Sequence, residues 1–287
     1  MTITHDSVIA QIKQSILADL ASQVDRICSA NVVSRKDLLS LAGRGNYVAA
    51  LLWTWRPFLQ WIWGALYDRS SSAPLNCIWT KQIEHAIFWM KAFLSGTHGS
   101  LSRTYYLDAF LNRGSAVGIT IDASPWGLAA YLCINDAPVA WFSSCITEVD
   151  ELQFSKSIGS CEGQQLWESL AALVALRVWK DKWASGRIRL QIPGDNVTML
   201  SLLVRLRPPT DSPGLGLIAR EMALDIGEAV YAPDISEHLP GVANIVADSL
   251  SRKFEVGVTN WTLPRFLLRV PESLVPCRDR SYYRTLS

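Results

Sequence analysis

Four carboxylate residues stand at positions from which a fold could bring them together. Asp122 and Asp195 each follow a strand-like run, whereas Glu168 and Asp248 lie in segments of helical character. Carboxylate oxygens are the ligands that hard divalent cations such as Mg²⁺ and Mn²⁺ prefer. The four residues therefore indicate a metal site, provided that the elements carrying them converge.

The strongest of these signals is Glu168, because the helix predicted over residues 162–182 is apolar almost all the way round. Between Leu166 and Trp179 only Glu168 and Arg177 are charged, and a helix of this kind is buried. An ionised carboxylate inside it costs several kcal/mol unless a cation or hydrogen-bond donors compensate. Arg177 is a poor partner, since nine residues place it more than two helical turns away. A cation from elsewhere should meet Glu168.

The surrounding pattern predicts the elements that position these residues. Strand-like runs at 117–122, 126–134 and 138–146 are separated by short turns, which favours an antiparallel meander. After the buried helix we expect a strand, two helices, a fifth strand and a final helix, at 187–192, Val197–Leu206, Leu217–Ala229, Val230–Ile235 and from Asn244.

Four motifs in this part resemble the ribonuclease H domain of a retroelement reverse transcriptase. They are Ile121–Ala130 around the first acid, Trp167–Ala172 around the glutamate, Gly194–Asn196 at the third acid, and the ending His238–Arg252, which reads HLPGVANIVADSLSR. The DASPWG and GDN elements are most similar to the DIRS-type lineage of retrotransposons. The resemblance implies an α/β, ribonuclease H-like fold, with a mixed five-stranded sheet flanked by helices.

The same resemblance implies hydrolysis of the RNA strand of an RNA–DNA hybrid with two Mg²⁺ or Mn²⁺ ions, which together serve the attacking water and the leaving oxygen. Asp122 would bridge both ions, and Glu168 and Asp195 would hold the ion on the leaving-group side. Asp248 would hold the ion that activates water. His238, which titrates near neutrality, would assist product departure or proton transfer.

Other interpretations stay open. Asp122 before Ser-Pro could be a turn former, Asp248 a surface helix residue, and His238 an ordinary loop histidine. Pro193–Gly194 departs from the family pattern and could displace Asp195 from its strand. The chain could therefore be a catalytically inactive nucleic-acid-binding or protein-interaction remnant of a retroelement. It could also be another nuclease or a transposase that needs only three carboxylates.

The N-terminal third is predicted to be mainly helical. Apolar spacing favours a helix over Ser7–Ile27. Ser34 is a candidate N-cap for a second, short helix that Gly43 and Gly45 should end. Residues 47–67 form a tryptophan-rich block, which we interpret as an aromatic core in preference to a base-stacking surface.

The sequence VSRKDLLSLAGRGNYVAALLWTWRPFLQWIWGAL in this third resembles the thumb and connection segment of retroelement reverse transcriptases. No Tyr-x-Asp-Asp polymerase motif occurs in the chain, so we expect no polymerase activity from it. The predicted organisation is a thumb/connection-like region at 1–95, a ribonuclease H-like domain at 96–255 and a basic extension at 256–287. The expected partners are an RNA–DNA hybrid and a reverse transcriptase polymerase region.

Composition sets the remaining bounds. The chain has 287 residues, 49% of them hydrophobic, and a net charge of +1, so a nucleic-acid surface must be a local patch. Six cysteines without C-x-x-C spacing and only four histidines argue against a zinc site or a disulfide framework. No apolar run is long enough for a membrane span or resembles a signal peptide. We expect an intracellular location, in the cytoplasm or the nucleus.

Overall fold

A four-stranded mixed sheet carries the first predicted carboxylate. The computed structural model describes residues 1–68, 72–111, 113–184, 188–209, 211–229 and 237–286. As predicted, three consecutive strands form an antiparallel meander, and a later strand pairs in parallel with the first of them. The sheet order is β8-β7-β6-β9, with strands β6 (Ala116–Ala123), β7 (Gly127–Ile134), β8 (Ala137–Cys145) and β9 (Arg189–Gln191).

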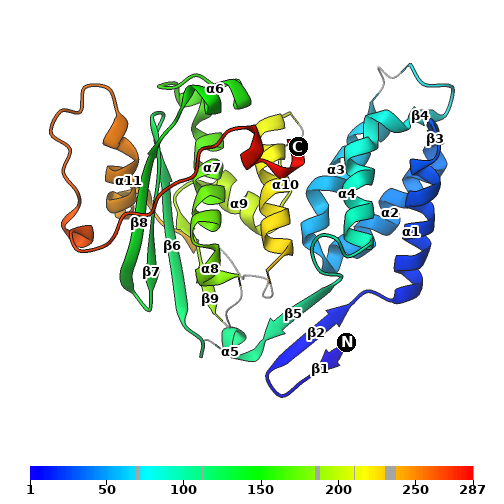
Figure 1. The fold of residues 1–287 in the computed structure, drawn as a ribbon, viewed down its shortest axis with the longest axis horizontal. Coiled ribbons are helices and arrows are strands. Elements are labelled where there is room, and N and C mark those ends of the chain that lie inside the picture. Colours follow the sequence, from blue (N-terminus) through cyan, green and yellow to red (C-terminus); the bar gives the residue numbers. More distant parts are fainter. Residues whose placement is uncertain (69–71, 112, 185–187, 210, 230–236, 287) are drawn as a thin grey trace.

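Helices cover both faces of this sheet (Figure 1). One face packs against α7 (Gln164–Val178), in which every residue from Leu166 to Leu176 is buried, as the apolar pattern predicts. Beside α7 lie α8 (Lys180–Trp183), α9 (Val197–Arg205) and α10 (Pro213–Gly227). The opposite face carries α11 (Ile245–Ser251). Because helices cover both faces, the middle strands β6 and β7 are apolar along most of their length.

The predicted fifth strand, Val230–Ile235, lies outside the described residues. Next to it along the chain, β11 (Glu237–His238) pairs in parallel with β10 (Pro193–Gly194). The described part of the chain is thus a mixed α/β fold with a four-stranded main sheet and this two-stranded ladder beside it. The prediction of an α/β fold is confirmed to that extent.

The first residues of the chain form strands, which corrects the prediction of a helix over Ser7–Ile27. Residues Ser7–Gln11 are strand β2, and α1 begins only at Gln14 and ends at Cys28. Strand β2 lies between β1 (Thr2–Ile3) and β5 (Ser102–Tyr106) in an antiparallel sheet. Long-range pairing with β5 therefore outweighs the local helical spacing. This small sheet also links the N-terminal region to the chain entering β6, through the short α5 (Leu107–Phe110).

Helix α2 (Arg35–Leu51) begins where predicted but does not stop at Gly43 or Gly45. Ser34 accepts a hydrogen bond from the Asp37 backbone N–H, as a helix N-cap does. The helix continues because Gly45 faces α3 (Arg56–Tyr67): a Cβ at Gly45 would lie 2.5 Å from a methyl carbon of Leu59. The glycine serves close helix packing, and the prediction of a stop there was wrong.

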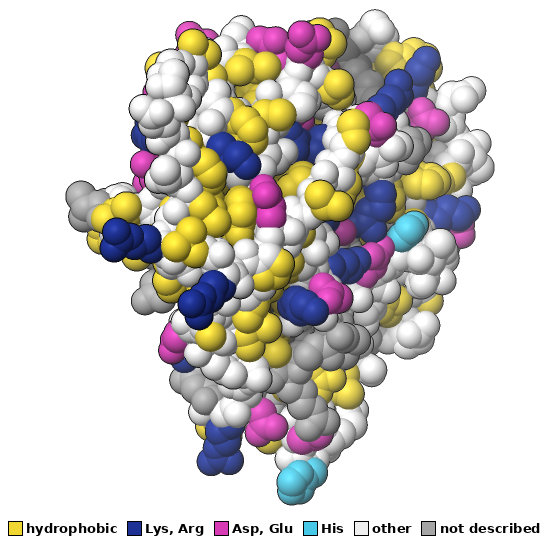
Figure 2. All heavy atoms as spheres, turned by 60° about the vertical axis from the view of Figure 1, so that its left-hand side comes forward, with side chains coloured by type: hydrophobic (Ala, Val, Ile, Leu, Met, Phe, Trp, Pro, Cys, Tyr) yellow, Lys and Arg dark blue, Asp and Glu magenta, His cyan; other side chains and the backbone are white. Residues whose placement is uncertain are grey.

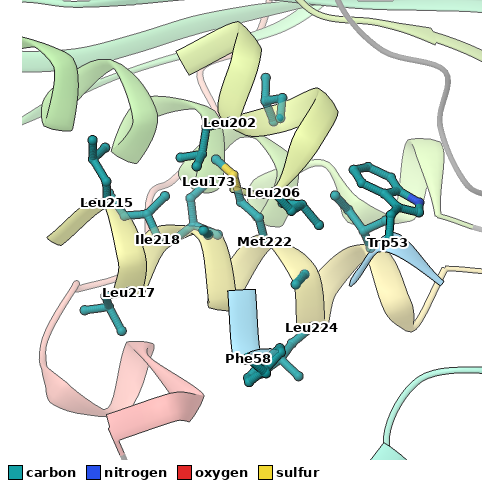
Figure 3. Packing of buried hydrophobic residues seen from close by; sticks show 14 of the residues in the cluster. Trp53, Phe58, Leu173, Leu202, Leu206, Leu215, Leu217, Ile218, Met222 and Leu224 are labelled. Atoms are coloured by element: carbon teal, nitrogen blue, oxygen red, sulfur yellow. The ribbon is translucent and has the colours of Figure 1, made fainter. Parts of the chain in front are cut away.

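The tryptophan-rich block is largely core, as interpreted from the sequence. Trp53 and Trp55 are buried, and Phe58 on α3 packs edge-to-face on Phe93 of α4 (Glu84–Leu94). The helices are tied by a short ladder between β3 (Val32–Ser34) and β4 (Cys77–Trp79). Figure 3 shows Trp53 and Phe58 beside α10 residues such as Leu224, so one continuous core joins the N-terminal helices to the α/β part.

The C-terminal segment after α11 runs back over the sheet edge to α7 and α10 (Figure 1). Glu272 bridges to Trp141 of β8. Arg278 is buried and holds Asp150 through two hydrogen bonds of 2.9 and 2.7 Å. Asp150 belongs to the capping box of α6 (Glu148–Phe154), a helix that the sequence reading missed. Part of the predicted basic extension therefore serves internal pairing.

The view in Figure 2 shows Lys and Arg side chains scattered among acidic and hydrophobic ones, with no single-sign patch. Near α11, Arg252 pairs with Asp248 and Glu255, and Lys253 pairs with Glu272. A cationic surface for a polyanion must therefore be sought elsewhere on the molecule. Within the described ranges, no helix combines the length and apolar character that crossing a membrane requires.

Candidate metal centre

Asp122 is fixed near the end of β6 by two residues that flank or belong to α11. Its side chain is 4% exposed. Asn244 donates a hydrogen bond of 3.1 Å from Nδ2 to Asp122 Oδ1, and Ser251 donates one of 2.6 Å from Oγ to Oδ2. Each carboxylate oxygen therefore has one neutral donor, and neither interacts with a cation in these contacts. This carboxylate is held in place without being neutralised.

The turn after Asp122 brings α11 close enough to make these contacts. Ser124 Oγ donates to the Ser251 carbonyl at 2.7 Å. At Gly127 a Cβ would lie 2.5 Å from that same carbonyl oxygen, so only glycine lets the end of α11 approach β7 this closely. The DASPWG sequence thus positions the partners of its own aspartate.

Glu168 enters the site from the first half of α7 and is 3% exposed. Gln164, one helical turn earlier, donates from Nε2 to Glu168 Oε1 at 3.0 Å and to the Ala123 carbonyl at 2.5 Å. The other oxygen, Oε2, is buried and has no hydrogen-bond partner. A buried carboxylate oxygen without a donor is costly, and this atom could serve as a ligand to a cation.

Asp195 follows the β10–β11 ladder. Pro193–Gly194 does interrupt the strand that begins with β9, but the two residues pair with Glu237–His238 and the chain stays beside β6. A Cβ at Gly194 would lie 2.5 Å from the Met199 terminal methyl, and one at Gly241 would lie 3.1 Å from Asp195 Oδ2. The departure from the family pattern therefore does not carry Asp195 away from the site.

The structure brings Asp122, Glu168 and Asp195 together. One carboxylate oxygen from each residue lies within 4.8 Å of the other two. Burial, together with the charges of Asp248 and Asp195, raises the pKa of Asp122 to about 7. Burial, and then the charges of Asp122 and Asp195, raise the pKa of Glu168 well above its usual range. These three residues are called the acidic cluster below.

Asp248 and His238 are the other two predicted site residues. Asp248 lies on α11 near enough to raise the pKa of Asp122, but its carboxylate is partly exposed and accepts a 2.8 Å hydrogen bond from Arg252 Nε. It is outside the cluster of three. The His238 backbone pairs with Gly194, adjacent to Asp195, and its side chain lies outside the described part of the structure. Of the five predicted site residues, the described structure thus brings together Asp122, Glu168 and Asp195.

The acidic cluster could hold a metal ion. Its donor atoms are all carboxylate oxygens, the set that suits hard divalent cations. Charge balance agrees, because three carboxylates at this spacing cannot all ionise cheaply without a cation between them, and Glu168 Oε2 has no other partner. Among the described residues, Arg177 and Arg278 pair with other carboxylates. Arg252 pairs with Asp248 and acts on Asp122 only through its more distant charge.

Three positioning residues have roles that the sequence reading did not assign. Asn244 and Ser251 belong to the quoted C-terminal motif, yet only the fold shows that both donate to Asp122. Gln164 had a sequence signal, since it lies four residues before Glu168 on the same helix face. These side chains orient the carboxylates and thereby preorganise a site for a cation.

Comparison with known proteins gives fold-level resemblance only. No protein-family model and no curated protein matches the chain. Among solved structures, it is similar to RNase H1 from Halobacterium salinarum, with 19% identity over 47% of this chain and 93% of that one, at a TM-score of 0.33.

It is also similar to the foamy viral protease–reverse transcriptase. The structure with double-stranded DNA gives 17% identity over 78% of this chain and 35% of the viral one, and the structure with an RNA/DNA hybrid gives 14% over 79% and 28%; both TM-scores are 0.31. The chain thus spans about a third of that viral protein.

Proposed function

We propose that the chain is a metal-dependent endonuclease of the ribonuclease H type, which hydrolyses the RNA strand of an RNA–DNA hybrid. The observation that supports this most is the acidic cluster: three carboxylates, two of them buried, whose oxygens converge and which take part in no ion pair between described residues. The order of its residues along the chain, strand-end Asp, helix Glu and Asp after a strand, is the order that the sequence motifs imply.

Each residue of the cluster has a distinct task in this proposal. Asp122 is held by one hydrogen bond to each of its oxygens and would be one of the residues that hold the metal ions. Glu168 offers its free Oε2, and Asp195 completes the set. Mg²⁺ or Mn²⁺ ions held there would activate a water molecule and stabilise the leaving oxygen. The protein supplies the placement and the dry surroundings on the α7 side.

Asp248 and His238 take subordinate roles. The Asp248 side chain is 44% exposed and paired with Arg252, so it would have to exchange this partner to hold a second ion. His238, beside Asp195 in the β10–β11 ladder, would assist proton transfer or product departure. Both roles follow from the sequence motif and await direct tests.

The convergence of three carboxylates, with Asp248 apart, also favours a second candidate: another nuclease on the same fold that needs only three acids. A catalytically inactive nucleic-acid-binding remnant would need the cluster to have lost its cation, although all three ligands are present. These candidates predict different substrates or none, so one assay separates them.

The assay follows end-labelled RNA in an RNA–DNA hybrid, with Mg²⁺, Mn²⁺ or chelator. Parallel reactions contain the same sequence as duplex DNA, duplex RNA and single strands. Our proposal predicts internal cleavage of RNA in the hybrid alone, abolished by chelator and by Asp122→Asn. Cleavage of duplex DNA would support the three-acid nuclease, and no cleavage by the folded protein would support the remnant.

The N-terminal region enters the proposal as a grip on the hybrid, with no polymerase activity. The boundaries at residues 95 and 255 remain predictions. The β2–β5 pairing crosses the first boundary, and the shared core joins both sides of it. An enzyme of this kind, working with a reverse transcriptase polymerase region, would act inside the cell, in the cytoplasm or the nucleus.

A further inference from the structure

Two adjoining cavities follow the line where α3 meets described residues of the connection between α9 and α10, namely residues 206–209 and 211–212. We call this line the seam. The cavities have volumes of about 380 and 550 Å³, and they share Gln60 of α3 and Pro208 of the connection as lining residues. Both lie outside the acidic cluster.

The walls of the seam are tied together. Arg56 Nη1 donates a 3.1 Å hydrogen bond to the Arg205 carbonyl, and Gln60 Nε2 donates one of 2.9 Å to the Pro208 carbonyl. Residues almost 150 positions apart in sequence therefore hold a fixed opening.

The smaller cavity is cationic. Arg56 and Arg207 line it together with polar Asn46 and Gln60, and no carboxylate is among its described lining residues. Arg56 Nε is buried and lacks a hydrogen-bond acceptor. Burial lowers the pKa of Arg56, and the nearby charges of Arg207 and Arg103 lower it further. The positive charges of Arg207 and Arg103 thus act on Arg56, and the described lining of the smaller cavity carries no opposite charge.

The larger cavity adds Arg220 from α10. Its guanidinium lies 3.8 Å from the centre of the Trp61 ring, and its Nε is buried without a partner. Burial lowers the pKa of Arg220 to about 10, so the side chain stays charged at neutral pH. The charge of Glu221 partly offsets the effect of burial on Arg220, and Asp68 also lines this cavity, but no ion pair among the described residues joins Arg220 to either carboxylate. A largely buried cation without a close ion pair can take up an anion.

We propose that the seam binds the phosphodiester backbone of a nucleic-acid strand, with phosphates at Arg56 and Arg207 and a further one at Arg220. Guanidinium groups suit phosphate oxygens because their donors form a planar fork. Cations in two connected cavities fit a chain of phosphates better than a single ion. The nature of the ligand rests on the proposed function.

The location fits this role. Helix α9 begins two residues after Asp195, has nine residues and is therefore roughly 14 Å long. It ends at the seam. A strand whose scissile phosphate lies at the acidic cluster could reach the seam within a few nucleotides.

The test measures binding of a fluorescein-labelled RNA–DNA hybrid to the full chain in chelator, so that hydrolysis plays no part. The double variant Arg56→Gln/Arg207→Gln should weaken binding at least tenfold. It should also reduce the slope of log K against log salt by about two, since each lost phosphate contact removes about 0.9. A control variant, Arg26→Gln/Lys36→Gln, removes two exposed cations from α1 and α2 and should bind nearly as the parent does.

Arg207→Gln alone guards against misfolding, because Arg207 is exposed; it should lower the slope by about one. Charge-retaining Arg56→Lys/Arg207→Lys should recover most of the binding. Equal losses in the seam and control variants would overturn the proposal. So would unchanged hybrid binding in a seam variant that has lost affinity for inorganic phosphate, which would make the seam a small-anion site.

The outcomes for the two proposals are separable. Seam-dependent binding without any cleavage in Mg²⁺ or Mn²⁺ would contradict the nuclease proposal alone. Metal-dependent cleavage by a protein whose hybrid binding ignores the seam variants would contradict the seam proposal alone.

Discussion

Helix α7 contributes one charged residue to each of two groups of charged side chains: the acidic cluster and a second group around Arg177. The two groups differ in whether arginines pair with their carboxylates. Near its beginning, Glu168 joins Asp122 and Asp195, and none of the ion pairs between described residues involves these three carboxylates. Near its end, Arg177 meets the carboxylates of Glu221 and Asp225 on α10, at 2.5 and 2.7 Å. In the second group, called the paired network here, the buried carboxylates are neutralised.

The C-terminal segment completes the paired network. Arg284 contacts Asp225 at 2.7 Å, and Thr285 donates to Glu221 from both its backbone N–H and its hydroxyl, each at 2.7 Å. Both oxygens of Glu221 are thus satisfied, whereas Glu168 keeps one oxygen unpartnered. The comparison shows that burial of a carboxylate does not by itself mark a candidate metal site, because the carboxylates of the paired network are buried and compensated by arginines.

The largest expected effect concerns catalysis at the acidic cluster. Glu168→Gln removes a ligand charge while preserving shape, and we expect hybrid cleavage to fall by on the order of 10³-fold, as when one transition-state-stabilising group is lost. The control is Glu162→Gln, an exposed residue just before α7, which should keep near-parental rates. Rates are measured at saturating hybrid. A Glu168→Gln enzyme within threefold of the parent would remove Glu168 from the proposed site.

In the paired network, substitution should lower the stability of the protein, in contrast to the effect on catalysis expected at the acidic cluster. Arg177→Met leaves two buried carboxylates without their main partner, and the free energy of unfolding should fall by about 3–5 kcal/mol. Lys180→Met removes a cation that is 36% exposed, pairs with Glu228 at 2.7 Å and reaches Asp225 only at 3.9 Å, so it should cost less than about 1 kcal/mol. Urea unfolding in chelator measures both. Equal costs for the two variants would show that burial of the pair is unimportant.

A smaller effect is a pH dependence specific to the acidic cluster. The pKa of Asp122 is raised to about 7 in the folded state, mainly by burial, from about 3.9 in an unfolded chain. Between these values the unfolded state releases its proton first, so stability falls as pH rises from about 4 to 7, by up to about 1.4 kcal/mol per pH unit for one such group. Below about pH 4 Asp122 becomes protonated in both the folded and the unfolded state, so it no longer makes the free energy of unfolding depend on pH.

Asp122→Asn should remove this contribution, so its stability in chelator should exceed that of the parent increasingly as pH rises from 4 to 7. Urea unfolding at four pH values within that window gives the comparison. A constant difference between variant and parent would mean that Asp122 ionises normally in the folded protein.

Sequence patterns predicted the local part of the fold well. The meander, the buried helix and the N-cap at Ser34 depend on spacing within short windows, and the structure confirms them. The prediction of a helix at Ser7–Gln11 was wrong because its apolar residues suit a helix and a strand equally, and only the distant partner β5 decides between them. The prediction that Gly45 ends a helix was wrong for a similar reason, because the contact that explains this glycine is with Leu59 on another helix.

For the candidate site, too, local sequence patterns identified some residues, and other features depend on contacts between distant elements. Asp122, Glu168 and Asp195 could be singled out because each follows or interrupts an apolar run. The ion pair that occupies Asp248, the free oxygen of Glu168 and the partners of Arg177 could not, because these depend on side chains brought together from different elements. The sequence spacing excluded Arg177 as a partner of Glu168, but it could not identify Glu221 as the residue that pairs with Arg177.

The most direct test of the contrast between the two clusters is a titration of thermal stability with MgCl₂ or MnCl₂ at pH 7.5, for the parent, Glu168→Gln and Lys180→Met. The acidic cluster should bind the ion only when folded, so the melting temperature of the parent and of Lys180→Met should rise with metal concentration, as mass action requires. Glu168→Gln should start at or above the metal-free parent and rise much less. A parent that gains no stability from either metal, or a Glu168→Gln protein that gains as much as the parent, would contradict the assignment of this cluster as a metal centre.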